Sequence, residues 1–241
     1  MHGLEFREPV STWTHLVWML LSLPATAWLW SGSRGDRPKQ ISLLVFGVSL
    51  FLCFAGSSLY HGVCLPPDWV DFFEMLDFIG IYLLIAGSCT PIAFTLLRGR
   101  WRWGILALAW SFASVGILLR LALGQVSPWV YNSLYLAMGW GLVSCYFELA
   151  RAVSHRALLL VLVGGVLYTI GALLNAVSWP ALWPGVFMAH ELFHVLVMAG
   201  SACHFFFMLR WVVPYPRQAA DLAAEAATGW DSSVSSGPIS G

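Results

Sequence analysis

Charged residues are scarce in this sequence. Asp, Glu, Lys and Arg make up 10% of the 241 residues, whereas a soluble domain carries roughly a quarter. Hydrophobic residues make up 59%, and the mean hydropathy is +0.76. The net charge is zero, so no excess of positive charge points to nucleic acid as a partner. These values exclude a soluble globular domain and predict an integral membrane protein.

Three sequence signals of other protein classes are also missing. The five cysteines are scattered without a C-x-x-C pair, and most lie in apolar runs, which favours small buried residues over disulfides. The N-terminus has no basic stretch before its first apolar run, so we expect no cleavable signal peptide. The chain also lacks an Asp-Gly pair, which bears on one of the enzyme classes considered below.

Seven apolar runs are long enough to cross a bilayer, which takes about 20 residues. We therefore expect an all-α polytopic membrane protein, a bundle of seven transmembrane helices within residues 1–212. The segment from Pro66 to Glu74 is predicted to be a polar loop, and residues 213–241 a polar, disordered C-terminal tail. The predicted spans cover about 13–33, 41–63, 75–97, 103–123, 129–149, 157–178 and 185–211.

The distribution of Lys and Arg predicts how the protein is inserted. The loops after the first, third and fifth spans, together with the tail, hold ten of the twelve basic residues. The opposite side holds only Arg7 and Arg120. This bias predicts a multi-pass protein of the plasma (inner) membrane, with the N-terminus outside and the C-terminus in the cytoplasm.

Polar residues gather at one face of the predicted bundle. His190 and His194 are four residues apart, so they lie on one face of a helix, one turn from each other. Because helix direction alternates, the starts of spans one, three and seven and the end of span two lie at the same membrane face. Those places hold His15, Asp77, the His190–His194 pair and His61.

This layer predicts a zinc site. His61, His190 and His194 supply three nitrogens, and the fourth position stays open, as catalytic zinc requires. Asp77 is placed to act on water as a general base. Ser57 lies one turn before His61 on the same helix face, where it could bind a developing oxyanion or orient the water.

Other polar residues have competing interpretations. Glu191 completes a literal H-E-x-x-H, in which Glu is the base of soluble metalloproteases, but it could equally face a polar cavity or a neighbouring helix. His15 fits either a position behind the metal ligands or a role in capping at the interface. We interpret His204 as structural, since it lies ten residues beyond His194. Arg120 is expected to extend to the membrane interface.

The order of these motifs resembles the hemolysin III family, the bacterial branch of the progestin and adipoQ receptor superfamily. The resemblance runs from Glu8 to about Trp211, with Ser11 where the family pattern usually has Asn. It rests on E-x-x-S-x-x-T-H from Glu8 to His15, S-x-x-x-H from Ser57 to His61, Asp77 followed by L-I-A-G-S-C-T-P, G-G-V-L-Y-T-I-G from Gly164, and H-E-L-F-H from His190.

The resemblance implies a seven-helix bundle with zinc near one membrane face. In the adiponectin receptors, residues matching His61, His190 and His194 bind zinc, and an aspartate matching Asp77 contacts the water on it. Those receptors are similar in layout to alkaline ceramidases and have been assigned hydrolysis of a lipid amide. They hold the N-terminus in the cytoplasm, whereas the basic residues here predict the opposite orientation.

Four functions are weighed. A zinc-dependent hydrolase of a lipid amide or ester, ceramidase-like, accounts for the three histidines and the carboxylate, with membrane lipids as substrate. A pore-forming cytolysin, which the family name implies, predicts a continuous polar stripe that the sequence lacks. An intramembrane metalloprotease needs a further aspartate ligand, typically in an Asp-Gly pair. A receptor with a structural zinc is the fourth; no protein partner and no oligomeric state is predicted.

Overall fold

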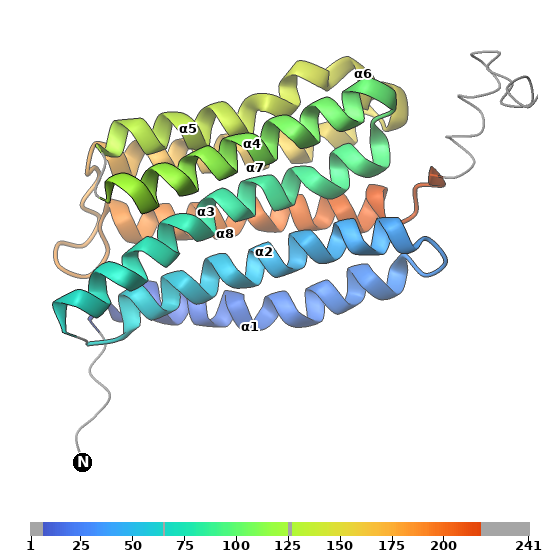
Figure 1. The fold of residues 1–241 in the computed structure, drawn as a ribbon. Helices are drawn as coiled ribbons and strands as arrows, with labels where there is room; N and C mark the ends of the chain where they lie inside the picture. The colour runs from blue at the N-terminus through green and yellow to red at the C-terminus, as the bar shows by residue number, and fades with distance from the viewer. Residues whose placement is uncertain (1–6, 65, 125–126, 218–241) are drawn as a thin grey trace, which may run out of the picture.

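The computed structural model describes residues 7–64, 66–124 and 127–217, and these residues form an all-α bundle (Figure 1). Within these ranges the regular structure consists of helices, and the only β-pairing is an isolated bridge between Trp183 and Phe187. The helices run roughly alongside one another. Helices are expected inside a membrane because they satisfy every backbone amide within the segment itself. The prediction of an all-α fold is confirmed.

The described chain forms seven successive helical segments. Because α5, a 3₁₀ turn and α6 follow one another without a gap, they count as one segment. The last segment ends in a π-helical turn over Met208–Val212. The elements are α1 (Pro9–Gly32), α2 (Arg37–Gly62), α3 (Pro67–Leu96), α4 (Gly99–Leu123), α5 (Pro128–Trp140), the 3₁₀ turn (Gly141–Cys145), α6 (Tyr146–Ala152), α7 (His155–Ala176) and α8 (Ala189–Phe207).

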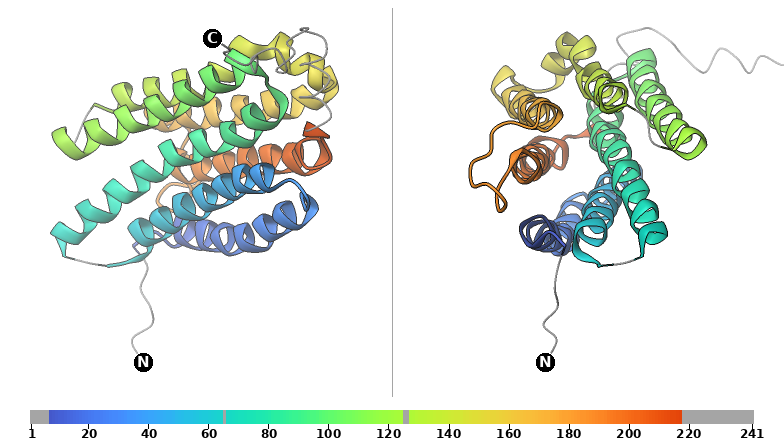
Figure 2. Two further views of the ribbon diagram at one scale, coloured as in Figure 1. Left: turned by 45° about the vertical axis from the view of Figure 1, so that its right-hand side comes forward. Right: turned by 90° about the vertical axis from the view of Figure 1, so that its left-hand side faces the viewer.

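The helices close into a ring in which the first and last lie side by side (Figure 2). α1 packs on α2, α2 on α3, and α3 on α4; α5 contacts α3, α4 and α7, α7 packs on α8, and α8 contacts α1. The starts of α1, α3 and α8 and the end of α2 lie at the same end of the bundle (Figure 1). This is the end at which the sequence predicts the polar layer.

Five helices are long and apolar enough to span a membrane: α2, α3 from Trp69, α4, α7, and α8 together with its π-helical turn. α1 is of similar length but rich in Trp, Ser and Thr, and α5 is shortened by the 3₁₀ turn; both lie beside the other five and complete the bundle. Large apolar side chains such as Leu118, Phe147 and Trp28 are exposed on the outside. A surface of this kind suits lipid, and the protein is a polytopic membrane protein.

The predicted start of the third span is wrong, and the fifth span is not α-helical throughout. α3 begins at Pro67 rather than near residue 75, so most of the predicted polar loop is helix. Proline and acidic residues are favourable at a helix N-terminus, which explains why a loop-like composition can start a helix. The predicted span 129–149 lies within the continuous segment of α5, the 3₁₀ turn and α6, but the α-helix changes to the 3₁₀ turn after Trp140, where Ser144 Oγ donates a hydrogen bond of 2.7 Å to Gly141 O.

The start of the predicted tail is held against the bundle. Lys39 Nζ donates to the carbonyl oxygens of Val213 and Tyr215, at 3.0 and 2.5 Å. Arg217 donates to both carboxylate oxygens of Asp36, which also caps α2 by accepting from Lys39 N. Burial raises the pKa of Asp36, but these hydrogen bonds outweigh it and leave the pKa below its ordinary value. Residues 218–241 of the predicted tail lie outside the described residues.

Glycines set how closely the helices approach. A Cβ at Gly80 in α3 would lie 2.7 Å from the Cys53 Cα of α2, which is backbone and cannot move aside alone. In α7 and α8, Gly164 and Gly200 face each other, and a Cβ on either would come within 3.1 Å of the other's carbonyl oxygen. Small residues allow such close contacts in membrane bundles, where van der Waals packing drives helix association.

Candidate metal centre

His190 and His194 occupy the first turns of α8. The chain leaves the helical conformation after α7 at residues 177–188, a segment with the pairs Trp179-Pro180 and Trp183-Pro184, and restarts as helix at Ala189. Glu191 Oε2 accepts a hydrogen bond of 2.7 Å from Met188 N, so this side chain folds back over the start of the helix. Capping of this kind satisfies an amide that the helix itself leaves unpaired. Glu191 thus serves the helix end in this structure, and the alternatives of a polar cavity or a neighbouring helix do not describe it.

The end of α2 brings a third imidazole to the same point. His61 Nε2 lies 3.3 Å from His190 Nε2, and His194 Nε2 lies 3.0 Å from His190 Nε2. One ring nitrogen from each of the three lies within 4.8 Å of the others. His61 and His194 are 1% and 2% exposed, whereas His190 is only partly buried, so two of the three rings are shielded from water. The predicted convergence of these residues is therefore present in the structure.

The spacing of the three nitrogens can be compared with what a metal ion requires. A tetrahedral ion bound at about 2.0–2.1 Å holds neighbouring histidine nitrogens about 3.3–3.4 Å apart. The two short separations in the cluster, 3.3 and 3.0 Å, are close to this value. Imidazole nitrogens suit zinc and other divalent transition metals. All three ligand nitrogens lie within 4.8 Å of one another, so the residues could hold a single metal ion once the widest of the three separations narrows toward the tetrahedral spacing.

Two of the histidines have polar side chains behind them. His61 Nδ1 lies 2.7 Å from Glu8 Oε2, at the residue that precedes α1, which is an ion-pair distance. His190 Nδ1 lies 3.1 Å from Asn175 Oδ1 near the end of α7, within hydrogen-bonding distance. The contact with His61 holds the pKa of Glu8 below its ordinary value. Neither Glu8 nor Asn175 is among the predicted site residues. The only signal for Glu8 is its place in the first motif, and Asn175 has none.

Asp77 borders the cluster, and Ser57 lies one turn before His61 on α2. Asp77 Oδ2 lies 3.9 Å from His61 Nε2, which puts its carboxylate beside the point where the three nitrogens meet. Ser57 is 1% exposed, and its hydroxyl has no hydrogen-bond partner among the described residues. The structure thus places Asp77 beside the metal cluster, and the catalytic roles of Asp77 and Ser57 stay predictions.

His15 packs against the cluster from α1. Its ring lies edge-on to His194, with centroids 4.1 Å apart, and edge-on to Phe54 at 4.9 Å. The residue is 3% exposed, and neither ring nitrogen has a hydrogen-bond partner among the described residues. Of the two interpretations of His15, a position behind the metal ligands matches this placement and capping at the interface does not.

Two other polar residues lie apart from the cluster. His204 is buried, and its Nε2 lies 3.3 Å from the carbonyl oxygen of Val161, in keeping with a structural role. The expectation that Arg120 extends to the interface is wrong. Arg120 is 8% exposed and donates to Glu74 Oε2 at 2.5 Å, because an acidic partner on α3 is within reach.

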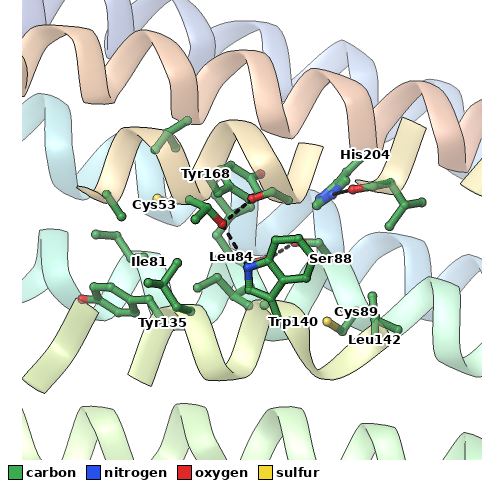
Figure 3. Close-up of a pocket in the computed structure, with 18 of the residues that line it drawn as sticks. Cys53, Ile81, Leu84, Ser88, Cys89, Tyr135, Trp140, Leu142, Tyr168 and His204 are labelled. Carbon is green, nitrogen blue, oxygen red and sulfur yellow. Dashed lines mark hydrogen bonds between the residues drawn. The ribbon is translucent and has the colours of Figure 1, made fainter. Parts of the chain in front are cut away.

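An apolar cavity lies between α3, α5, α7 and α8 (Figure 3). Phe193 lines it, and the same ring lies beside His194, with centroids 5.5 Å apart. The cavity continues along α3 from Ile81 to Ile92, away from the three histidines of the metal cluster. Its few polar side chains include Ser88 and Tyr168. An elongated apolar group could thus lie in the bundle with one end near the metal cluster.

Comparison with known proteins identifies the family. A sequence model of the family described as Haemolysin-III related matches residues 5–205. The chain belongs to this family. It is 32% identical to Hemolysin-3 of Bacillus cereus over 203 residues, 83% of this chain and 90% of that protein. It is 30% identical to the Hemolysin-3 homolog of Bacillus subtilis (strain 168) over 205 residues, 84% of this chain and 93% of that protein.

More distant relatives extend the family beyond bacteria. The chain is 26% identical to the Adiponectin receptor protein of Drosophila melanogaster over 221 residues, 82% of this chain and 49% of that protein. The resemblance to the hemolysin III family within the progestin and adipoQ receptor superfamily is thereby confirmed.

Proposed function

We propose that this member of the Haemolysin-III related family is a zinc-dependent membrane hydrolase that cleaves an amide or ester bond of a lipid. The observation that carries the proposal is the meeting of the His61, His190 and His194 Nε2 atoms beside the Asp77 carboxylate. A purely structural metal is usually enclosed by four protein ligands, whereas a catalytic one keeps a position open. Three histidines with an adjacent carboxylate fit the second arrangement.

The surroundings favour a lipid as substrate. The apolar cavity shares Phe193 with the surroundings of the metal cluster, so an acyl chain lying in it would present its head to the histidines. Burying such a chain is favourable by about 0.8 kcal/mol for each CH₂ that leaves water. The acyl chain of a membrane lipid is already out of water, so it gains less free energy than this on entering the cavity. The shape of the cavity and the length of the chain then select the substrate.

The residues around the cluster have distinct roles in this proposal. Zinc supplies a Lewis acid that polarises a carbonyl and makes water more acidic. Asp77 accepts the proton of the attacking water and passes it to the leaving nitrogen or oxygen. Ser57 donates a hydrogen bond to the oxyanion that develops on the carbonyl. The burial of His61 and His194 keeps bulk water from weakening these interactions.

Cytolysis is the second candidate, since two relatives bear the name Hemolysin-3. A pore needs polar groups along its whole length, whereas the cavity between α3, α5, α7 and α8 is lined mainly by apolar side chains. A receptor with a structural zinc is the third candidate, supported by the name of the Drosophila relative. Both differ from hydrolysis in predicting that Asp77→Asn leaves the function intact.

We also propose that the metal cluster faces the outer side of the plasma (inner) membrane. Arg34 and Arg98 lie in the connections after α1 and α3, and Arg37 and Arg100 lie in the first turns of α2 and α4, at the end of the bundle opposite the cluster (Figure 1). The positive-inside rule assigns that end to the cytoplasm. Fusions to the C-terminus test this: green fluorescent protein should fluoresce and alkaline phosphatase should be inactive, and the reverse result would contradict the orientation.

Hydrolysis is tested with purified, zinc-loaded protein. The substrates are a fluorescent ceramide and an ester of matched chain length, and the variants are wild type and Asp77→Asn. We expect cleavage of at least one substrate by wild type and a rate about 100–10,000-fold lower in the variant, with unchanged zinc content. Equal cleavage rates in the two proteins would overturn the proposal. So would the absence of cleavage in both proteins together with vesicle leakage caused by both, which would favour cytolysis.

A further inference from the structure

Two of the three candidate ligands receive support from helices that supply no ligand. Glu8, just before α1, contacts His61 Nδ1 at 2.7 Å, and Asn175 of α7 contacts His190 Nδ1 at 3.1 Å. In each ring the supported nitrogen is the one that faces away from the cluster, because Nε2 faces the other histidines. The two contacts therefore act on the same property of both rings.

That property is the position of the ring proton. A carboxylate can only accept hydrogen bonds, and its negative charge 2.7 Å from Nδ1 favours the tautomer of a neutral His61 ring that has its proton on that nitrogen. The Asn175 oxygen is likewise an acceptor and places the proton of His190 on Nδ1. In both rings Nε2 is then left with a bare lone pair. Lone pairs 3.3 Å apart repel each other unless a cation lies between them.

We infer that Glu8 and Asn175 are positioning residues, which fix the tautomer and the ring orientation of His61 and His190 for metal binding. Partners of this kind raise the basicity of ligating histidines as well as orienting them. This inference rests on the proposed metal site. It assigns a positioning role to α1 and α7, which supply no ligand themselves. The metal centre then depends on four helices rather than on α2 and α8 alone.

His194 differs from the other two rings. Its Nδ1 is buried and has neither a hydrogen-bond partner nor an ion-pair contact such as that of His61 among the described residues. Its ring is held instead by packing against His15 and Phe193, with centroids 4.1 and 5.5 Å away. Without metal, His194 can keep its proton on Nε2 and donate it to His190, 3.0 Å away. His194 is therefore the ligand whose proton must move when a metal binds.

Glu8 is well placed for such a role because it is anchored twice. Its backbone N–H donates to the His61 carbonyl oxygen at 3.0 Å, while its side chain contacts the ring of the same residue. Thr12 Oγ1 also donates to the Glu8 carbonyl oxygen at 2.7 Å. Since the backbone contacts do not depend on the carboxylate, a change of the side chain alone leaves the attachment of α1 in place.

The test measures metal affinity rather than activity. Full-length protein in detergent is titrated with Zn²⁺ against a chelator, as wild type, Glu8→Ala, Glu8→Gln and Asn175→Ala. Glu148→Ala is the matched control, because Glu148 pairs with Arg151 on the exposed side of α6. We expect Glu8→Ala and Asn175→Ala to weaken zinc binding about 10–100-fold. Glu8→Gln keeps an acceptor oxygen for His61 and should lose less, and the control should match wild type.

A second readout separates positioning from general damage to the fold. The visible spectrum of bound Co²⁺ reports ligand geometry, and it should change in Glu8→Ala and Asn175→Ala while the melting temperature of the metal-free protein stays near that of wild type. Wild-type zinc affinity in both variants would overturn the inference while leaving the metal site intact. Absence of metal binding in wild type would overturn the proposed function itself. If Glu8→Ala does not fold, Asn175→Ala decides the question from α7.

Discussion

The buried ion pair between Arg120 and Glu74 yields a prediction about stability. Arg120, near the end of α4, donates to Glu74 Oε2 at 2.5 Å and to the Gly124 carbonyl oxygen at 2.9 Å. Its guanidinium also lies 4.7 Å from the centre of the Phe78 ring. Glu74 and Phe78 flank Asp77 on α3, so this contact ties the segment that carries the proposed general base to α4.

The size of the effect follows from burial. The side chains are 9% and 20% exposed, so water cannot solvate either charge once the other is removed. Removing one partner of a buried pair costs about 3–5 kcal/mol, whereas an exposed pair is worth about 0–1 kcal/mol. Arg120→Met should therefore cost several kcal/mol. Glu74→Gln in the same chain should restore part of the loss, since no uncompensated charge then remains.

A double-mutant cycle measures this coupling. Wild type, both single variants and the double variant are unfolded reversibly in mixed micelles by increasing SDS, with Trp fluorescence as the signal. We expect the double variant to be more stable than the sum of the single losses predicts, by about 1–3 kcal/mol. Losses that add within about 0.5 kcal/mol would refute the reasoning and show that Arg120 is solvated at the interface, as the sequence suggested.

Three further predictions concern packing, the cavity and acid stability. Gly80→Ala should lower stability by about 1–3 kcal/mol, because its Cβ would meet the Cys53 backbone at 2.7 Å; Gly104→Ala, with no described atom within 4 Å of its Cβ, should not lower it in the same thermal assay. Gly165→Leu should narrow the cavity and reduce turnover of long-chain lipids with unchanged zinc content, and unchanged chain-length preference would contradict that placement of the substrate. The folded-state pKa of Asp36 is lowered, so its contribution to stability is present at neutral pH and is lost as pH falls below about 4. Wild type should thus lose melting temperature between pH 5 and 3 more steeply than Asp36→Asn, and parallel curves would contradict this.

The meeting of the three histidines could be predicted because few physical rules are involved. Alternation of helix direction fixes which helix ends share a membrane face, and the four-residue spacing of His190 and His194 fixes that both point the same way. Helix length is set by the bilayer, so the position of His61 along α2 sets its depth. These rules need only the runs of apolar residues and not the details of packing.

Residues that depend on packing between helices could not be predicted in the same way. The partners of Glu8 and Asn175 follow from the rotation of α1 and α7 about their axes, which composition does not define. The sequence suggested that Arg120 extends to the interface because Glu74 was expected to lie in a loop. Whether Glu74 can reach Arg120 depends on where α3 begins. That start was misplaced because the Pro66-Pro67 pair and the acidic residues after it look like a loop, although they are also good first residues for a helix.

The metal content of detergent-purified protein, wild type beside His194→Ala, tests the central claim most directly. His194 is 2% exposed and its Nε2 lies 3.0 Å from that of His190, so its loss removes one of three ligands without opening the surface. We predict about one zinc per wild-type chain and none in the variant, with the same helical content in both. Folded, monodisperse wild-type protein without zinc, or equal zinc in wild type and variant, would contradict the assignment of this site.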